Sequence, residues 1–469
     1  MDAVFLSRIQ FAVTTMFHIL FPVLTIGLSL FLVVVEFRWL QTKQEIYYRI
    51  YRFWVRIFAI NFGVGVLSGV VLEFEFGTNF SHFSQMVSNV FSPLLAFEVM
   101  TAFFLEAGFL GIMLFGWEKV PRSVHFLATF LVALATMLSA FWILAANSWM
   151  QTPVGYQLAN GKFMVTDFLT AIFNPSLPIR VSHMLAAAFE TSMFVVAGIS
   201  AYFLLKRRQV DLSRTSLAIA LVMAGLCSPL QIYLGDLSGR QVFHHQPVKL
   251  AAMEAHWETN THNGAPFTVI AVPHMEQERN LYNIAIPNVL SLLVTHTLDG
   301  QVQGLKAFPK ENRPNVFILF WAFRLMVAIG FTLFFVMVWA ALLWRKGSLF
   351  DHRPFLWTLL IVHPLGFLAT ELGWMTTEVG RQPWVVYNVM RTAEGVSPIP
   401  AGNVIWSLGL FLIILPAIGA IYFFYILKTL RRGADLSSPI PPIQRPMGMR
   451  SHEGREILNS KQEFRNRFE

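Results

Sequence analysis

The sequence predicts an all-α polytopic membrane protein of about nine transmembrane helices, with its N-terminus outside and its C-terminus in the cytoplasm. Of the 469 residues, 55% are hydrophobic and only 13% are charged, whereas a typical soluble domain is about 25% charged. The apolar residues form long runs such as "VLTIGLSLFLVVV". Runs of roughly 18 or more apolar residues are long enough to cross the hydrocarbon of a bilayer as a helix.

Nine apolar runs follow one another, and each is expected to form one membrane span. One long polar insertion separates the sixth run from the seventh, and the polar segment after the ninth run, with "SSPIPPIQRP", is expected to be disordered. The chain therefore divides into helices 1–6 (1–235), an outer loop (236–314), helices 7–9 (315–428) and a cytoplasmic tail (429–469). The runs cover 11–37, 54–74, 93–116, 124–148, 181–205, 214–235, 315–344, 355–377 and 402–427.

The basic residues set the orientation. The formal net charge is +8, but Lys and Arg gather at the ends of the runs, which indicates membrane topology rather than nucleic-acid binding. They follow every odd-numbered run, whereas the loop after the second run, "GTNFSHFSQMVSN", has none. By the positive-inside rule the odd-numbered helices exit to the cytoplasm, so the long insertion lies outside. Examples are Arg38, Lys119, Lys206, Arg345 and Lys428.

Polar side chains inside the runs are candidates for function, because a charge at the bilayer centre costs at least ~2.5–3.5 kcal/mol on insertion scales. Five of them come from five different helices and lie near the outer end of their helix, which random placement would not favour. These five are His18, Glu98, His183, Met326 and Glu378. The others are Glu106, Glu190, Arg324, His363 and Glu371.

The types and spacing of these side chains restrict the chemistry. No two of the five lie at i, i+4 on one helix, which disfavours a tetrahedral zinc site. The single cysteine, Cys227, excludes an internal disulfide and a Cys-based metal cluster. Lone His, Met and carboxylate ligands on separate helices suit haem. Spacing alone leaves two classes open: a haem electron-transfer protein, and a transporter or proton channel that relays protons through Glu and His without haem.

Several motifs resemble subunit I of the cytochrome bd-type quinol oxidases, in order and over nearly all spans. They are "LSRIQFAVTTMFHILFPVLTIG", "FEFGTNF", "FEVMTAFFLEAGFLG", "LSAFWILAANSWMQ", "KLAAMEAHWET", "FWAFRLMVAIGF" and "ELGWMTTEVGRQPW". The short outer insertion is similar to the short-loop version of the family, and membership of the cyanide-insensitive branch stays open. The resemblance implies a quinol:O₂ oxidoreductase of the bacterial cytoplasmic (inner) membrane. It also implies three haems near the outer face: a low-spin b, a high-spin b, and a d or a b in its place.

The resemblance assigns ligands residue by residue. His183 and Met326 match the axial ligands of the low-spin haem, and His18 and Glu378 match ligands of the two high-spin haems. Glu98 matches a carboxylate beside the oxygen-binding haem and is a further candidate iron ligand. Three more side chains are expected to contact the cofactors, namely Arg324, Trp374 and Arg381.

Quinol and proton sites follow from the same resemblance. Lys249 and Glu254 match the pair that oxidises ubiquinol or menaquinol in the outer loop, while Glu106 and Ser139 match a polar path that carries protons inward. Expected partners are the family's subunit II, a small single-helix subunit, O₂ and membrane lipid, with no nucleic acid.

The stretch "TTEVGRQPW" has its own physical logic. A carboxylate at Glu378 can neutralise the positive charge of a ferric porphyrin core in a low dielectric. Arg381, about one turn on, can hold a haem propionate through a charge-assisted fork. Pro383 cannot continue the hydrogen-bond ladder of the helix, so the chain is expected to turn there at the membrane surface.

Overall fold

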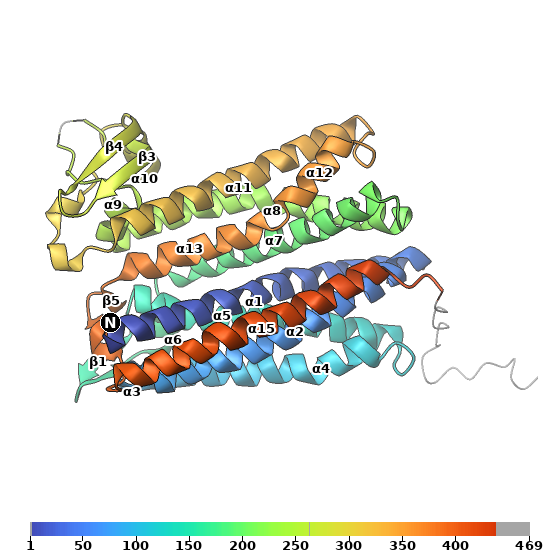
Figure 1. The fold of residues 1–469 in the computed structure, drawn as a ribbon, viewed down its shortest axis with the longest axis horizontal. Coiled ribbons are helices and arrows are strands. Elements are labelled where there is room, and N and C mark those ends of the chain that lie inside the picture. Colours follow the sequence, from blue (N-terminus) through green and yellow to red (C-terminus); the bar gives the residue numbers. More distant parts are fainter. Residues whose placement is uncertain (1, 262, 438–469) are drawn as a thin grey trace, which may run out of the picture.

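The computed structural model describes residues 2–261 and 263–437. Nine helical spans in this part of the chain are long and apolar enough to cross a membrane, which confirms the predicted number (Figure 1). They are formed by α1 (Ala3–Thr42), α2 (Glu45–Thr78), α3 (Ser81–Glu98) continued through the π-helical segment η1 (Val99–Phe103) into α4 (Phe104–Phe115), α5 (Arg122–Gln151), α7 (Leu177–Leu205), α8 (Val210–His245), α11 (Val316–Arg345), α12 (Arg353–Val362) with α13 (Leu365–Arg381), and α15 (Ala401–Arg432).

Several helices run beyond the apolar limits that the sequence indicated. The first begins at Ala3 rather than at 11, where the Asp2 side chain caps it by accepting a hydrogen bond from the Phe5 amide at 2.9 Å. The sixth, α8, continues to His245, ten residues into the segment predicted to be loop. The ninth reaches Arg432, past the predicted start of the tail. Polar turns can extend a helix outside the hydrocarbon, and hydropathy does not detect them. Residues 438–469 of the predicted tail lie outside the described residues.

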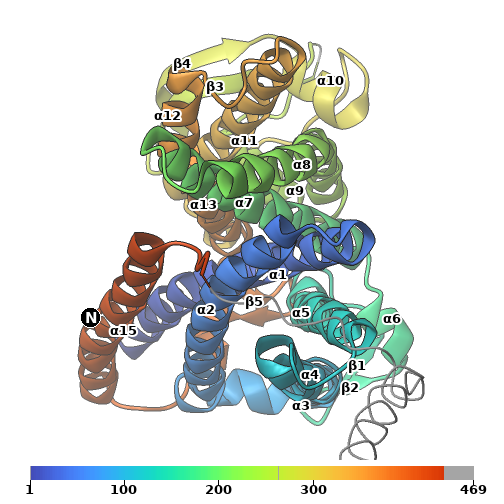
Figure 2. The ribbon, with the colours of Figure 1, turned by 90° about the vertical axis from the view of Figure 1, so that its right-hand side faces the viewer.

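Two helices form the centre of the bundle. α1 and α7 have the most buried apolar windows of the nine spans, whereas only 6% of the α15 window is buried. Viewed from one end, α1 and α7 are surrounded by the other helices and α15 lies at the side (Figure 2). α1 packs closely on α7 at Gly27, where an added Cβ would lie 2.6 Å from the backbone oxygen of Ala188.

The eighth span is broken into two helices. α12 ends at Val362 and α13 begins at Leu365, after Pro364, whose ring nitrogen has no hydrogen to donate. Nδ1 of the His363 ring donates a 2.6 Å hydrogen bond to the Leu360 carbonyl, and the ring lies against Gly198 of α7. The break lets α13 approach α7 closely, since a Cβ at Gly366 would lie 2.6 Å from the hydroxyl of Thr191.

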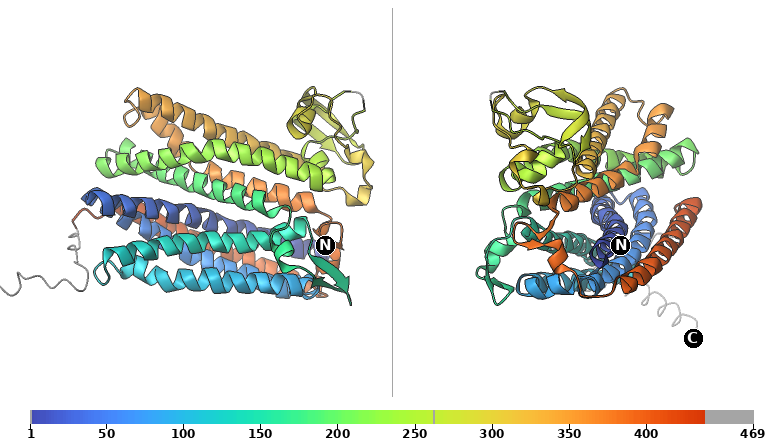
Figure 3. Two further views of the ribbon diagram at one scale, coloured as in Figure 1. Left: turned by 180° about the vertical axis from the view of Figure 1, so that it is seen from behind. Right: turned by 60° about the vertical axis from the view of Figure 1, so that its left-hand side comes forward.

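The insertion after α8 is folded rather than irregular. It contains α9 (Pro247–Met253), an antiparallel hairpin of β3 (Phe267–His274) and β4 (Arg279–Ile286), and α10 (Val289–Thr295). The hairpin lies at one end of the bundle, beside the start of α11 (Figure 3). The other short elements are β1 (Tyr156–Ala159), β2 (Lys162–Val165), α6 (Phe168–Ile172), η2 (Leu305–Ala307), η3 (Lys310–Asn312), β5 (Trp384–Val386), β6 (Met390–Arg391) and α14 (Thr392–Gly395).

The two ends of the bundle differ in character. The end that carries β3–β4 also holds the N-terminus and the short strands, and we call it the hairpin end (Figure 1). The opposite end holds the turns after α1, α4, α7, α11 and α15, where most of the predicted cytoplasmic Lys and Arg residues lie. We call it the basic end.

The contact between α1 and α7 gives a first prediction. Gly27→Ala should lower the melting temperature, because the new Cβ would meet the Ala188 backbone oxygen and the Ser192 side chain at 2.3–2.6 Å. Gly63→Ala is the matched control, since nothing lies within 4 Å of a Cβ there, and alanine favours a helix over glycine by up to ~1 kcal/mol. Thermal unfolding in detergent measures both, and equal melting temperatures would contradict the close approach.

Candidate functional site

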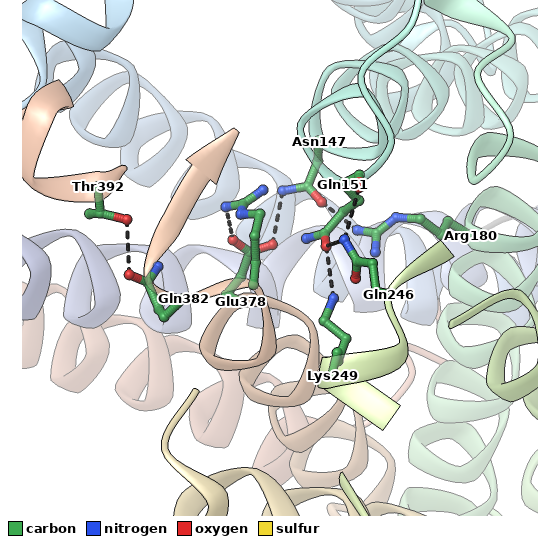
Figure 4. Close-up of polar contacts among 9 residues, drawn as sticks. Asn147, Gln151, Arg180, Gln246, Lys249, Glu378, Gln382 and Thr392 are labelled. Atoms are coloured by element: carbon green, nitrogen blue, oxygen red, sulfur yellow. Dashed lines mark hydrogen bonds and ion pairs between the residues drawn. The ribbon is translucent and has the colours of Figure 1, made fainter. Parts of the chain in front are cut away.

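A polar cluster lies where several helices finish at the hairpin end (Figure 4). Its members come from regions far apart in the sequence, and the bundle brings them together because each stands at a helix terminus at that end. They are Asn147 and Gln151 in the last turns of α5, Arg180 in the first turn of α7, Gln246 and Lys249 at the start of α9, and Glu378 and Arg381 at the end of α13.

Glu378 is the acidic member of this cluster. One carboxylate oxygen accepts a hydrogen bond from the Asn147 amide at 3.1 Å, and the other is ion-paired with Arg381. The Asn147 carbonyl oxygen in turn accepts from Arg180, whose Nε donates to Ser148 at 3.0 Å. The carboxylate is thus held by α5 and its own helix. About a third of its side chain, 32%, is still exposed.

Lys249 is buried in the same cluster. Its Nζ donates a 2.7 Å hydrogen bond to the side-chain oxygen of Gln151, and its stem lies on Gly380, where a Cβ would come within 2.7 Å of Lys249 Cε. Burial, reinforced by the positive charge of Arg180, lowers the pKa of Lys249 well below its ordinary value. Burial therefore makes this amine give up its proton more readily than an exposed lysine does.

The cluster has more positive than negative groups. Arg180, Lys249 and Arg381 face the single carboxylate of Glu378. Among the described residues, Nε and Nη1 of Arg381 and the amide nitrogen of Gln151 are buried without a hydrogen-bond partner. Unpaired buried donors are costly, so this arrangement favours an anionic group that accepts hydrogen bonds.

Glu254 has different partners from Lys249. It ends α9 and forms a buried ion pair with Arg324 of α11, at 2.5 Å between Arg324 Nη2 and Glu254 Oε2. Arg324 also donates to the Thr268 carbonyl at 2.7 Å and lies over the ring of Phe267. The two members of the predicted quinol pair thus lie on or at the end of one short helix, but they bind different helices: Lys249 contacts α5 and Glu254 contacts α11.

The predicted low-spin ligands face glycines on adjacent helices. His183 of α7 lies against Gly235 of α8; its Nε2 is 3.4 Å from the Gln231 amide nitrogen, and its Nδ1 is buried without a partner among the described residues. Met326 of α11 faces Gly373 of α13, where a Cβ would lie 3.1 Å from its sulfur. Joint ligation by these two side chains stays a prediction.

His18 is oriented by a second side chain. Its Nδ1 lies 3.0 Å from the Ser68 hydroxyl, and the ring is in contact with the position of Gly69. A metal-bound histidine commonly donates its other ring nitrogen to such a partner. If Nδ1 carries the hydrogen, Nε2 presents its lone pair to a ligand, an assignment inferred from the hydrogen bond.

The predicted proton residues are brought together only in part. Ser139 of α5 donates a 2.7 Å hydrogen bond to Glu98 at the end of α3. Glu106 is buried in the first turn of α4, beyond the π-helical segment. The direct contact of Ser139 is therefore with Glu98. Of the remaining predicted residues, Trp374 lies 5.9 Å from the Arg180 guanidinium, and its indole nitrogen is buried and unpaired within the described chain.

Sequence reasoning missed four members of the cluster. Asn147 and Gln151 are four residues apart in the quoted motif "LSAFWILAANSWMQ", so they share a helix face. Arg180 is a basic residue at the outer start of a span, where the positive-inside rule does not expect one. Gln246 donates to the Gln151 carbonyl at 2.8 Å. Two features of the sequence could have indicated these residues: the spacing of Asn147 and Gln151, and an arginine at the outer end of a span.

The fold and site together define a class: a polytopic helical membrane protein whose buried, cation-rich site at one end can hold anionic groups beside lone His, Met and Glu side chains. A comparison of the chain with known protein families indicates the same class. The family model of cytochrome bd terminal oxidase subunit I matches residues 6–434. The chain belongs to this family, an oxidoreductase family of respiratory electron transport with membrane helices and haem.

Relatives and a solved structure cover almost the whole chain. The chain is 38% identical to cytochrome bd ubiquinol oxidase subunit 1 of Bacillus subtilis, over 93% of this chain and 95% of the relative. It is 35% identical to cytochrome bd-II ubiquinol oxidase subunit 1 of Escherichia coli, over 87% and 92%. The bd oxidase structure from Geobacillus thermodenitrificans has a TM-score of 0.85 at 33% identity, covering 92% of this chain and 99% of that one.

The residues present fit haem. Axial ligation needs one or two side chains per macrocycle, and within the described residues no group of three or more His, Cys, Asp or Glu could hold a bare metal ion. The unpaired donors of Arg381 and the buried, unpaired Nδ1 of His183 are groups that a haem carboxylate or iron would satisfy. The expected cofactor class therefore agrees with the site.

The ion pair at Glu254 yields a stability prediction. Glu254→Ala should destabilise the folded protein by about 3–5 kcal/mol, because it leaves the Arg324 guanidinium buried without its counter-charge. Glu258→Ala is the control, since Glu258 pairs with Lys306 at the surface, and exposed pairs contribute little. Thermal unfolding of both variants measures the difference. Equal effects would show that the Glu254–Arg324 pair is not buried as described.

Proposed function

We propose that this chain is the haem-bearing catalytic subunit of a terminal quinol oxidase. Two quinols would supply four electrons and four protons, and one O₂ with four electrons and four protons would give two waters. The observation that carries the proposal is the cation-rich cluster around Glu378, with its unpaired buried donors, in a chain of the cytochrome bd subunit I family. When bound, haem supplies electron transfer and the iron at which oxygen is reduced.

Each side chain has a proposed part. His183 and Met326 would hold the low-spin haem, and His18 and Glu378 the two high-spin haems, with Glu98 beside one of them. Arg324, Trp374 and Arg381 would contact the cofactors. Three haems are proposed, a low-spin b, a high-spin b, and a d or a b in its place. Arg381 is ion-paired with Glu378 and Asn147 donates a hydrogen bond to it, and these two contacts would hold the carboxylate in place for an iron.

Lys249 and Glu254 would bind and deprotonate quinol at the hairpin end. Lys249 can donate a hydrogen bond to a quinone oxygen, and the Glu254 carboxylate can accept a quinol proton. The ion pair with Arg324 would hold the Glu254 carboxylate in position. The relatives' names include both ubiquinol and menaquinol oxidases, and the proposal is accordingly for a quinol.

Orientation follows from the charged ends. Basic residues gather at the end opposite the hairpin, which supports a bacterial cytoplasmic membrane location with the hairpin end outside and the C-terminus inside. Quinol protons would leave at the outer face, and protons for water would come from inside through Glu106, Ser139 and Glu98. A second membrane subunit, subunit II, is the proposed main partner, with a small single-helix subunit, O₂ and lipid as further ones.

A visible spectrum of the purified membrane complex tests the whole proposal. A haem oxidase absorbs visible light and changes its bands when quinol is added, whereas the alternative, a haem-free transporter or proton channel, is colourless. A folded complex without absorption bands in the visible range would contradict the proposal.

Met326→Leu tests the low-spin assignment. Leucine keeps approximately the volume and removes the sulfur, so the reduced low-spin band should be lost or shifted while the other haem bands stay. Met337→Leu is the control, since Met337 is also buried and lies about three turns after Met326 in the same helix. A normal low-spin band in Met326→Leu would show that the methionine is not a ligand.

Lys249→Met tests the quinol site. Methionine retains the stem that lies on Gly380 and removes the amine, so quinol oxidation should fall at least about tenfold with haem content unchanged. Lys306→Met, at an exposed lysine in the same insertion, is the control. Normal quinol turnover in Lys249→Met would exclude the assigned role.

A further inference from the structure

A carboxylate and an imidazole are buried as a pair toward the basic end of the bundle. Glu36 of α1 and His125 of α5 lie 2.7 Å apart, between Oε1 and Nδ1, and their side chains are 0% and 1% exposed. Their outer atoms, Oε2 of Glu36 and Nε2 of His125, have no partner among the described residues. The pair can take up one proton in two ways, as imidazolium beside carboxylate or as carboxylic acid beside neutral imidazole.

Further hydroxyl groups lie on the neighbouring faces of α1 and α5, between this pair and the middle of the bundle. Thr129, one turn beyond His125, contacts the Tyr51 hydroxyl of α2 at 2.8 Å. Two turns further, Thr136 lies 3.3 Å from Ser29 of α1. Residues 125, 129 and 136 share one face of α5, as 29 and 36 share one face of α1. Each hydroxyl can both donate and accept a proton.

A second buried carboxylate lies on the face of α13 that packs toward α1, because Phe367 and Trp374, four residues before it and three after it, pack against the cluster of Ile19, Val23 and Ile26. Glu371 of α13 is 8% exposed, and both its oxygens are buried without a partner among the described residues. It stands seven residues before Glu378, hence on nearly the same helix face and about 10 Å deeper. An unpaired carboxylate in such a place is costly, which makes it a functional candidate, and neither the ligand set nor the Glu98 path uses it.

We infer that these groups form a second proton route, from the Glu36–His125 pair through Ser29 and Thr136 to Glu371 below Glu378. His125 Nε2 takes a proton from the basic end, and the Nδ1 proton moves to Glu36. The hydroxyls pass it on by exchanging donor and acceptor roles, with water between stations about two turns apart. Glu371 holds the proton for oxygen reduction. The inference rests on the proposed function and differs from the proposed route through Glu106, Ser139 and Glu98.

The experiment uses the complete oxidase complex with variants that keep hydrogen bonding. Glu36→Gln still accepts from His125, Thr136→Val keeps the shape without the hydroxyl, and Glu371→Gln keeps the side-chain size. Each is made alone and combined with Glu106→Gln. Glu190→Gln is the control, because Glu190 is also buried in a span but is bonded to Ser228 at 2.5 Å, away from this route.

Three readouts separate the possible results: the haem spectrum, the rate at which quinol reduces the haems, and proton uptake during a single oxygen turnover. In the Glu106→Gln background each route variant should slow proton uptake at least about tenfold, with normal spectra and normal haem reduction. Glu371→Asp should restore part of the rate, and Glu190→Gln should have no effect.

Two results would overturn the inference. One is proton uptake that stays at the wild-type rate in all three single route variants and is no slower in the double variants than in Glu106→Gln alone. The other is loss of haem bands in Glu371→Gln with unchanged uptake in Glu36→Gln and Thr136→Val, which would make Glu371 a cofactor contact only. A wild-type complex without haem bands would instead overturn the proposed function, so the two failures are distinguishable.

Discussion

The ion-paired carboxylate of Glu378 is the interaction on which the rest of the site depends. A charge near hydrocarbon is stable only with compensation, and here Arg381 and Asn147 supply it directly while Arg180 holds Asn147. This requirement brings α5, α7 and α13 to one point. The helices are long and cross the whole bundle, so fixing their ends at the hairpin side also fixes the depth of every side chain below.

The excess of positive charge in the cluster explains why it is compatible with a cofactor. Two buried guanidinium groups, those of Arg180 and Arg381, lie beside the one carboxylate of Glu378, and Arg381 retains unpaired donors that a further anion would satisfy. Family membership implies haem, whose carboxylates supply such anions. The same balance accounts for the position of Lys249: its amine is tied to Gln151, and its lowered pKa reduces the charge that the cluster must hold.

Hydropathy predicted the nine spans because backbone groups in a bilayer must be satisfied within helices. The helix ends were predicted less well, as at α8, because polar turns beyond the hydrocarbon have no apolar signal. The lone His, Met and Glu residues were visible as polar side chains in apolar runs. Gln151 and Arg180 were not singled out, since their role depends on which helix ends meet, and that is set by tertiary packing around α1 and α7.

The placement of α9 connects the two halves of the site. Lys249 reaches Gln151 beside Glu378, while Glu254, five residues later, reaches Arg324, two residues before Met326. A helix of seven residues thus contacts both the predicted high-spin and low-spin ligand regions. A quinol bound between these side chains would be close to the residues of the low-spin site, and any shift of α9 would alter the compensation of Glu378 at the same time. In the proposed function, quinol binding and the charge balance around Glu378 are therefore linked through α9.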